Sequence, residues 1–237
     1  LVEQEFCCAP ACISMVMIRR RIPLISQELL GHAMGLTLPF DKEITSRFFN
    51  GHVGPASTIG YGVRVYEPEF HPNLVFEKLN IPLHFQFVPV SALKADDLLS
   101  FLDELTAGPV EDSKDILFCF NQRMLSPVSP LLPGGDRGSM QAHVCLFDRL
   151  EPSVMGLGWR VRIIDPAAGV PKWRVCDGRQ LLLAMQAIGD DLMGGVWLIH
   201  RRDRRPPTPP ADPPAASPGF PAAHVTPRPT VQTPLST

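Results

Sequence analysis

The chain has 237 residues, of which 45% are hydrophobic and 19% charged, and its formal net charge is −2. This size and composition are typical of one large globular domain or two small ones. The near-neutral charge gives no reason to expect nucleic acid or an acidic membrane surface as a partner. No stretch approaches the roughly 18 consecutive apolar residues that a membrane-spanning helix needs. We therefore expect no nucleic acid and no membrane among its partners.

The first half of the chain has the patterns of helices. Helices are expected over residues 8–20, 26–34, 41–49 and 92–105, and a glycine-rich loop over residues 51–62. Pro10 suits the first turn of the first helix, because its missing N–H would have no partner there. Ser26 is expected as the N-cap of the second helix and Gly35 as its stop.

The second half of the chain has the patterns of strands, rich in Val, Ile and Phe and separated by Gly and Pro. Strands are expected over residues 83–90, 115–121, 142–149, 160–164 and 195–200, with one helix over residues 179–188. Helices followed by strands indicate an α+β fold, in which an N-terminal helical layer packs on a C-terminal antiparallel β-sheet.

The composition changes sharply after Arg205. Residues 206–237 hold 11 of the 26 prolines and few large apolar side chains, so they cannot bury enough surface to offset chain entropy. We therefore divide the chain into a folded domain, residues 1–202, and a disordered Pro-rich tail, residues 203–237.

Six cysteines, at positions 7, 8, 12, 119, 145 and 176, are spread along the chain. This is not the dense pattern of a small secreted disulfide scaffold. Cys119 and Cys145 lie in apolar, strand-like runs and are expected to be buried core thiols. The cysteine usage fits a reducing compartment, so we expect a cytoplasmic protein.

Cys8 is the most informative residue of the chain. Ala9, Pro10 and an apolar run follow it, which predicts a thiol at the start of a helix. The unpaired N–H groups and the dipole at a helix N-terminus favour negative charge, and the thiolate is the nucleophilic form of cysteine. Cys7 is a rival by proximity, but the pattern of small residues and proline follows Cys8. Cys12, one turn later, is expected to pack beneath the site.

A thiol nucleophile needs a base and a third group that orients the base. His143 follows a polar, glycine-rich loop and opens an apolar strand, whereas Asp165 ends the strand 160–164 and begins a turn. Taken singly, each is most simply a strand-end or turn residue. Adjacent antiparallel strands would bring them together, and we take them as the candidate base and orienting acid.

Three blocks of sequence carry a resemblance to a known family: Cys-Ala-Pro-Ala-Cys, His-Val-Cys-Leu-Phe and Ile-Ile-Asp-Pro-Ala-Ala-Gly. Over about residues 4–200, the chain resembles the bacteriocin-processing, double-glycine-leader cysteine peptidases of the papain-like superfamily. The resemblance implies a papain-like fold without a cofactor or metal. It also implies a peptide or protein substrate, with a Gly-Gly leader in the nearest relatives. Carried over, Cys8 is the nucleophile, His143 the general base and Asp165 its orienting acid.

The chain departs from the family pattern at two positions. Ala9 stands where the family usually has glycine. The family's oxyanion-hole glutamine lies six residues before the nucleophile, where this chain has Val2, and Gln4 lies four residues before it. We assign the oxyanion hole to Gln4, with the backbone N–H of Cys8 as the other donor. Loss of one such donor typically costs about 3–4 kcal/mol of transition-state stabilisation.

Other functions use the same residues. An acyl or peptidyl transferase forms the same thioester and passes it to an amine or thiol instead of water, and the triad does not separate it from a hydrolase. A non-catalytic peptide-binding module would keep only the fold. A zinc site built from Cys7, Cys8, Cys12 and His143 is a fourth alternative, although the spacing matches the usual ligand pairs poorly.

Overall fold

The computed structural model describes residues 1–4, 6–39, 52–107, 114–125, 140–152 and 158–202. The chain divides into two units, Leu1–Asp203 and Arg204–Thr237, and every described residue belongs to the first. The helix expected over residues 41–49 and the tail expected over residues 203–237 lie outside the described residues.

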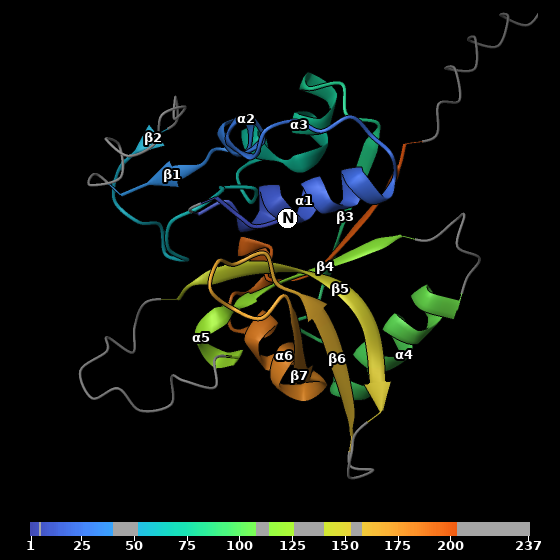
Figure 1. Cartoon of the computed structure of the whole chain (residues 1–237). Helices are drawn as coiled ribbons and strands as arrows, with labels where there is room; N and C mark the ends of the chain where they lie inside the picture. The colour runs from blue at the N-terminus through green and yellow to red at the C-terminus, as the bar shows by residue number, and fades with distance from the viewer. Residues whose placement is uncertain (5, 40–51, 108–113, 126–139, 153–157, 203–237) are drawn as a thin grey trace, which may run out of the picture. The chain divides into compact units, whose positions relative to one another are not determined.

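An antiparallel sheet of six strands forms the centre of the first unit (Figure 1). Its order is β3 (Leu83–Pro89), β8 (Gly195–Arg201), β4 (Asp115–Asn121), β5 (Ala142–Pro152), β6 (Trp159–Ile164) and β7 (Trp173–Asp177). Five of these strands were expected from the sequence and are confirmed within a few residues. The edge strand β7 was not expected, because its exposed Trp173 and Val175 alternate with Arg174 and Cys176 between charged residues.

The helices of the described region are α1 (Cys8–Arg19), α2 (Gln27–Ala33), α3 (Pro72–Lys78), α4 (Ala95–Ala107), α5 (Gln122–Leu125) and α6 (Gly178–Gln186), with short 3-10 turns η2 (Pro68–Phe70) and η4 (Asp190–Leu192). Four were expected and are confirmed, whereas α3 and α5 were missed. The Ser26 hydroxyl accepts the Leu29 N–H at 3.2 Å, so Ser26 caps α2 as expected. The loop expected over residues 51–62 contains the short strand β2 (His52–Val53), which pairs in parallel with β1 (Thr37–Leu38).

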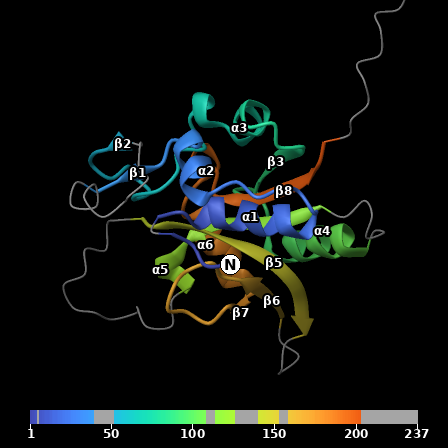
Figure 2. The same cartoon turned by 45° about the horizontal axis from the view of Figure 1, so that its top comes forward.

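Helices cover both faces of the large sheet: α1, α2 and α3 lie on one side and α4, α5 and α6 on the other (Figures 1 and 2). Alternate side chains of β4 pack into two hydrophobic cores, one on each face of the sheet. Leu117 and Cys119 pack with the first helical layer, whereas Phe118 and Phe120 pack with the second. Burial on both faces explains why β4 has a continuous apolar sequence. The expected α+β architecture with an antiparallel sheet is confirmed, and a second helical layer is added to it.

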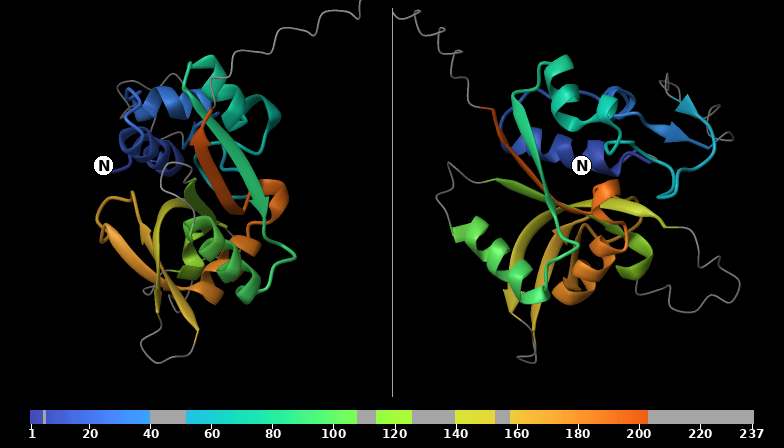
Figure 3. Two further views of the ribbon diagram at one scale, coloured as in Figure 1. Left: turned by 90° about the vertical axis from the view of Figure 1, so that its right-hand side faces the viewer. Right: turned by 180° about the vertical axis from the view of Figure 1, so that it is seen from behind.

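Helix α1 is deeply buried and packs against β5 (Figure 3). Ile13, Val16 and Met17 bury their side chains almost completely, and each such burial stabilises the fold by about 1.5–3 kcal/mol. The Cys12 thiol also donates to the Val144 carbonyl at 3.3 Å, as its expected place beneath the site requires. These contacts fix the N-terminus of α1 beside the start of β5. In the described part of the chain, no helix is long and apolar enough to cross a membrane.

A matched pair of leucines on α6 tests this packing. Leu181 is 0% exposed and Leu183 is 56% exposed, so the two changes to alanine alter the same helix by the same chemistry. We expect Leu181→Ala to lower the free energy of unfolding by about 2–5 kcal/mol, because it leaves a cavity. Leu183→Ala should change it by less than about 0.5 kcal/mol. Urea denaturation measures both, and equal losses would contradict the assigned face of α6.

Candidate active site

His143 and Asp165 form a buried hydrogen-bonded pair. The His143 Nε2 atom lies 2.8 Å from Asp165 Oδ1, and the two residues are 4% and 0% exposed. Strand β5 pairs with β6 so that Leu146 lies opposite Ile164. One further step of this register places Asp165 opposite Cys145, and His143 is two residues from Cys145 on the same side of the strand. Strand pairing therefore brings together two residues that are 22 positions apart.

The Asp165 carboxylate is held by a shell of donors. Its Oδ1 atom also accepts the Ala167 N–H at 2.9 Å, and its Oδ2 atom accepts a hydrogen bond from the Arg174 guanidinium of β7. Burial alone would raise the pKa of Asp165, but the hydrogen bond and charge of His143 oppose this. With Ala167 and Arg174, they hold the pKa well below its ordinary value of 3.8. Asp165 is thus a carboxylate at neutral pH.

The same pair favours a protonated His143. Burial alone would lower the pKa of the imidazole, but the hydrogen bond to Asp165 and the nearby thiols of Cys145 and Cys8 raise it well above 6.5. The edge of the Phe120 ring packs against the imidazole, with 5.9 Å between ring centroids and an interplanar angle of 89°. The ring is therefore held in place and is suited to exist as an imidazolium beside a thiolate.

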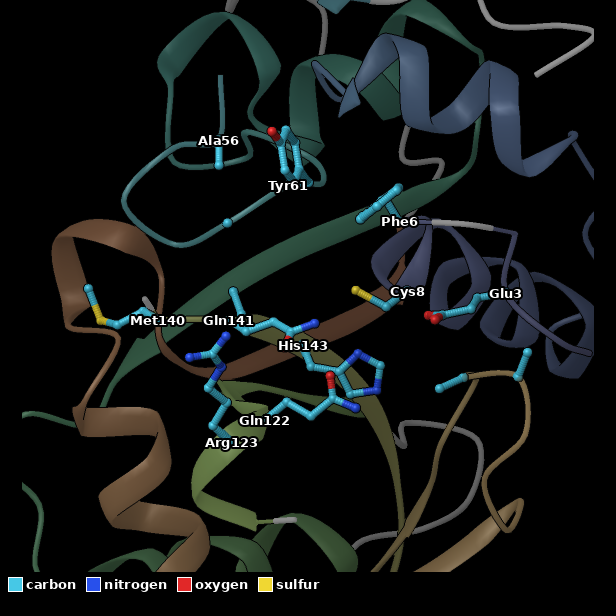
Figure 4. A pocket seen from close by; sticks show the side chains of 14 residues that line it. Glu3, Phe6, Cys8, Ala56, Tyr61, Gln122, Arg123, Met140, Gln141 and His143 are labelled. Carbon is cyan, nitrogen blue, oxygen red and sulfur yellow. The ribbon is translucent and has the colours of Figure 1, made fainter. Parts of the chain in front are cut away.

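Cys8 is the first residue of α1 and lines a pocket together with His143 (Figure 4). The Cys8 sulfur, a His143 ring nitrogen and a Glu3 carboxylate oxygen all lie within 4.8 Å of one another. Because Nε2 bonds Asp165, Nδ1 is the remaining nitrogen that can share a proton with the thiol. The first turn of α1 contains no acidic residue, and the N-cap Cys7 provides no side-chain cap. No acidic side chain of the helix's own first turn therefore offsets the N-terminal dipole.

The other cysteines near this pocket are buried. Cys7 is 2% exposed, packs against Leu36 and Leu38, and has its pKa raised to about 12, chiefly by burial. Burial likewise raises the pKa of Cys145 to about 12, although the nearby His143 acts in the opposite direction. Cys119 and Cys145 are core thiols, as expected, and burial excludes Cys7 as a rival nucleophile.

The structure does not bring Gln4, the expected oxyanion-hole residue, to the pocket. Gln4 is exposed, and its backbone N–H donates to the Gln27 side-chain oxygen at 2.9 Å. The Gln27 amide also donates to the Val2 carbonyl at 2.9 Å, so it holds residues 2 and 4 much as a neighbouring strand would. Side chains alternate along an extended segment. Glu3, between the two held residues, therefore turns into the pocket in place of Gln4.

The pocket has a volume of about 610 Å³ and is open to solvent. Its lining comes from five segments: Glu3, Phe6 and Cys8; Ala56, Gly60 and Tyr61; Gln122 and Arg123; Met140, Gln141, Ala142 and His143; Ala167 and Ala168. The segment expected as a glycine-rich loop contributes Ala56, Gly60 and Tyr61 to this lining. The Phe6 and Tyr61 rings meet edge to face at 5.6 Å and form an aromatic wall. Glu3, Gln122 and Arg123 were missed, because no local pattern marks their positions.

Two clusters place possible metal ligands close together: Glu3, Cys8 and His143, and His143, Cys145 and Asp165. The second is disfavoured as a cation site, because Asp165 is already bound by His143 and by the cationic Arg174. The first offers oxygen, sulfur and nitrogen ligands of the kinds that zinc accepts. The zinc set considered from the sequence also required Cys7 and Cys12, which belong to neither cluster within the described residues.

No family model matches the chain, and no curated protein matches it in sequence. The function therefore has to be inferred from the chemistry of the site.

The protonation state of His143 is directly testable. With the pKa of its imidazole raised above 6.5, His143 should stay protonated as the pH rises through 7. In Asp165→Asn the negative charge that opposes the effect of burial is lost, so we expect the pKa of His143 to fall. NMR titration of labelled histidines measures both, with His143→Gln to assign the signal. A wild-type His143 that loses its proton at or below pH 6.5 would contradict the described pair.

Proposed function

We propose that this chain is a papain-like cysteine peptidase that hydrolyses a peptide bond through Cys8, His143 and Asp165. The observation that carries the proposal is that Cys8 of α1 and His143 of β5 line one pocket, while the buried Asp165 at the end of β6 is hydrogen-bonded to the same His143 ring. Their order along the chain, and a nucleophile on a helix packed against an antiparallel sheet, agree with the resemblance to the bacteriocin-processing peptidases. That resemblance also supports the finer assignment of a papain-like fold.

The geometry supports a two-stage reaction. The Cys8 thiol gives its proton to His143, and the thiolate attacks the substrate carbonyl carbon. The carbonyl π electrons move to oxygen. On collapse the C–N bond breaks, and His143 gives the proton to the leaving amine. Water, deprotonated by His143, then hydrolyses the thioester and restores Cys8. Asp165 holds the ring through Nε2 and stabilises the imidazolium, so that Nδ1 faces the reaction.

The lining of the pocket suits an extended peptide. Gly60 has φ +97° and offers no side chain toward the pocket, so that a peptide backbone can approach it closely. The Phe6 and Tyr61 rings offer an apolar surface, and small residues at Ala167 and Ala168 leave room beside the catalytic pair. A Gly-Gly sequence before the cleaved bond, as in the double-glycine-leader family, would bring its backbone close to this lining of small residues.

Thiol reactivity provides the first test, without knowledge of the substrate. Near pH 7 we expect iodoacetamide to alkylate Cys8 on the order of 10-fold faster than Cys176. Cys176 is the matched control because it too is partly exposed, whereas burial raises its pKa to about 11. His143→Gln should remove the advantage of Cys8. Mass spectrometry of the modified peptides gives each rate, and equal slow labelling of both thiols would favour a non-catalytic module.

Peptide turnover provides the second test. Incubation with a peptide library rich in Gly-Gly sequences should yield cleavage products, and Cys8→Ala should reduce their formation at least about 1,000-fold. Added amine acceptors distinguish the reaction types: a hydrolase releases the free acid, whereas a transferase passes the acyl group to the amine. Products that form equally with Cys8→Ala would exclude Cys8 as the nucleophile.

A further inference from the structure

Glu3 occupies an unusual place for a carboxyl group. One of its oxygens lies within 4.8 Å of both the Cys8 sulfur and a His143 ring nitrogen. Its Oε2 atom is buried and has no hydrogen-bond partner among the described residues. The Glu3 backbone N–H donates to the Pro166 carbonyl at 2.8 Å, one residue beyond Asp165, which anchors the segment at the site. A buried, unpaired carboxyl oxygen beside a nucleophile indicates a group that gains its partner from the substrate.

The charges around Glu3 disfavour a carboxylate there. The facing groups are Cys8 of α1, His143 of β5 and Asp165 after β6, with Arg123 of α5 lining the same pocket. In the reactive state, the Cys8 thiolate and His143 imidazolium balance each other, and Arg174 balances Asp165. Burial raises the pKa of Glu3 above 4.5, His143 lowers it and Asp165 raises it again. An ionised Glu3 would place a second negative charge within 4.8 Å of the Cys8 sulfur.

We propose that Glu3 acts in its protonated form as the side-chain donor of the oxyanion hole, in the role first assigned to Gln4. Its carboxylic O–H donates to the substrate carbonyl oxygen as that oxygen becomes negative. The Cys8 N–H is the second donor, because the first N–H groups of a helix have no partner within the helix. This proposal rests on the proposed peptidase function and adds a catalytic residue to it. A neutral acid can donate where a carboxylate would repel the developing charge.

The test compares two reactions of Cys8. Acylation by p-nitrophenyl acetate forms an S–C bond, moves the carbonyl electrons onto oxygen and expels p-nitrophenolate, so it uses an oxyanion hole. Alkylation by iodoacetamide forms an S–C bond and expels iodide without an oxyanion. Both second-order rate constants are measured by mass spectrometry of the Cys8 peptide from about pH 4 to about pH 9, the range in which carboxyl and thiol groups titrate. Both reactions depend equally on the fraction of Cys8 that is thiolate, so this fraction cancels in the ratio of acylation to alkylation.

In the wild-type protein, the ratio should fall as the pH rises through the pKa of Glu3, which lies above 4.5. Glu3→Gln, a donor at every pH, should keep the ratio high and remove this pH dependence. Glu3→Ala should lower the ratio about 100-fold at low pH, as for loss of one oxyanion donor. Gln4→Ala is the matched control on the neighbouring exposed residue and should leave the ratio unchanged.

Several results would overturn the proposal. A wild-type ratio that rises with pH, or a Glu3→Gln ratio as low as that of Glu3→Ala, would mean that an ionised carboxylate is required. Stoichiometric binding of added Zn²⁺ that Glu3→Gln abolishes would also overturn it, because a metal-bound carboxylate donates no hydrogen bond. If Cys8 is alkylated fast but its ratio of acylation to alkylation does not change in the Glu3 variants, Glu3 is not the donor, whereas the proposed peptidase function is not contradicted. A Cys8 that reacts no faster than Cys176 in both reactions would remove the peptidase function itself.

Discussion

The pairing of β5 with β6 is the constraint on which the site depends. Its register places Asp165 opposite Cys145, two residues from His143 on β5. The hydrogen bond between Asp165 and Nε2 of His143 then orients the imidazole. The other contacts of the site build on this pair. The third element, α1, is docked on β5 by its buried apolar face and by the Cys12–Val144 hydrogen bond. The Cys8 thiol therefore lies beside the imidazole because a helix and a sheet pack against each other, and not because a flexible loop brings it there.

The parts of the site that could be predicted from sequence are those with a local chemical pattern. Cys8 stands before a proline and an apolar helix, and His143 and Asp165 stand at the ends of recognisable strands. Helix signals in the first half of the chain and strand signals in the second half were sufficient for the α+β class. Continuous apolar runs also located β4 and the first half of β5, because a strand segment buried on both faces is apolar throughout.

The parts that could not be predicted depend on contacts between distant segments. Arg174 lies on an edge strand whose exposed face carries Trp173 and Val175, so its apolar pattern does not resemble that of a buried strand. The choice between Glu3 and Gln4 depends on Gln27, more than 20 residues away, whose amide binds residues 2 and 4. Counting residues back from the nucleophile assumes a fixed loop geometry. Here a side chain of α2 sets that geometry, and Glu3 instead of Gln4 lines the pocket.

The site also illustrates how a fold places charge. Asp165, the buried anion of the site, has Arg174 as its counter-ion, and the imidazole of His143 lies beside the Cys8 thiol. Burying a charge without such a partner costs several kcal/mol, so a further carboxyl group in the same pocket is most stable when neutral. A neutral carboxyl group is also the form that donates a hydrogen bond. The desolvation that makes Glu3 a poor structural anion therefore makes it a suitable donor, and binding of a carbonyl oxygen would satisfy the buried Oε2 that lacks a partner among the described residues.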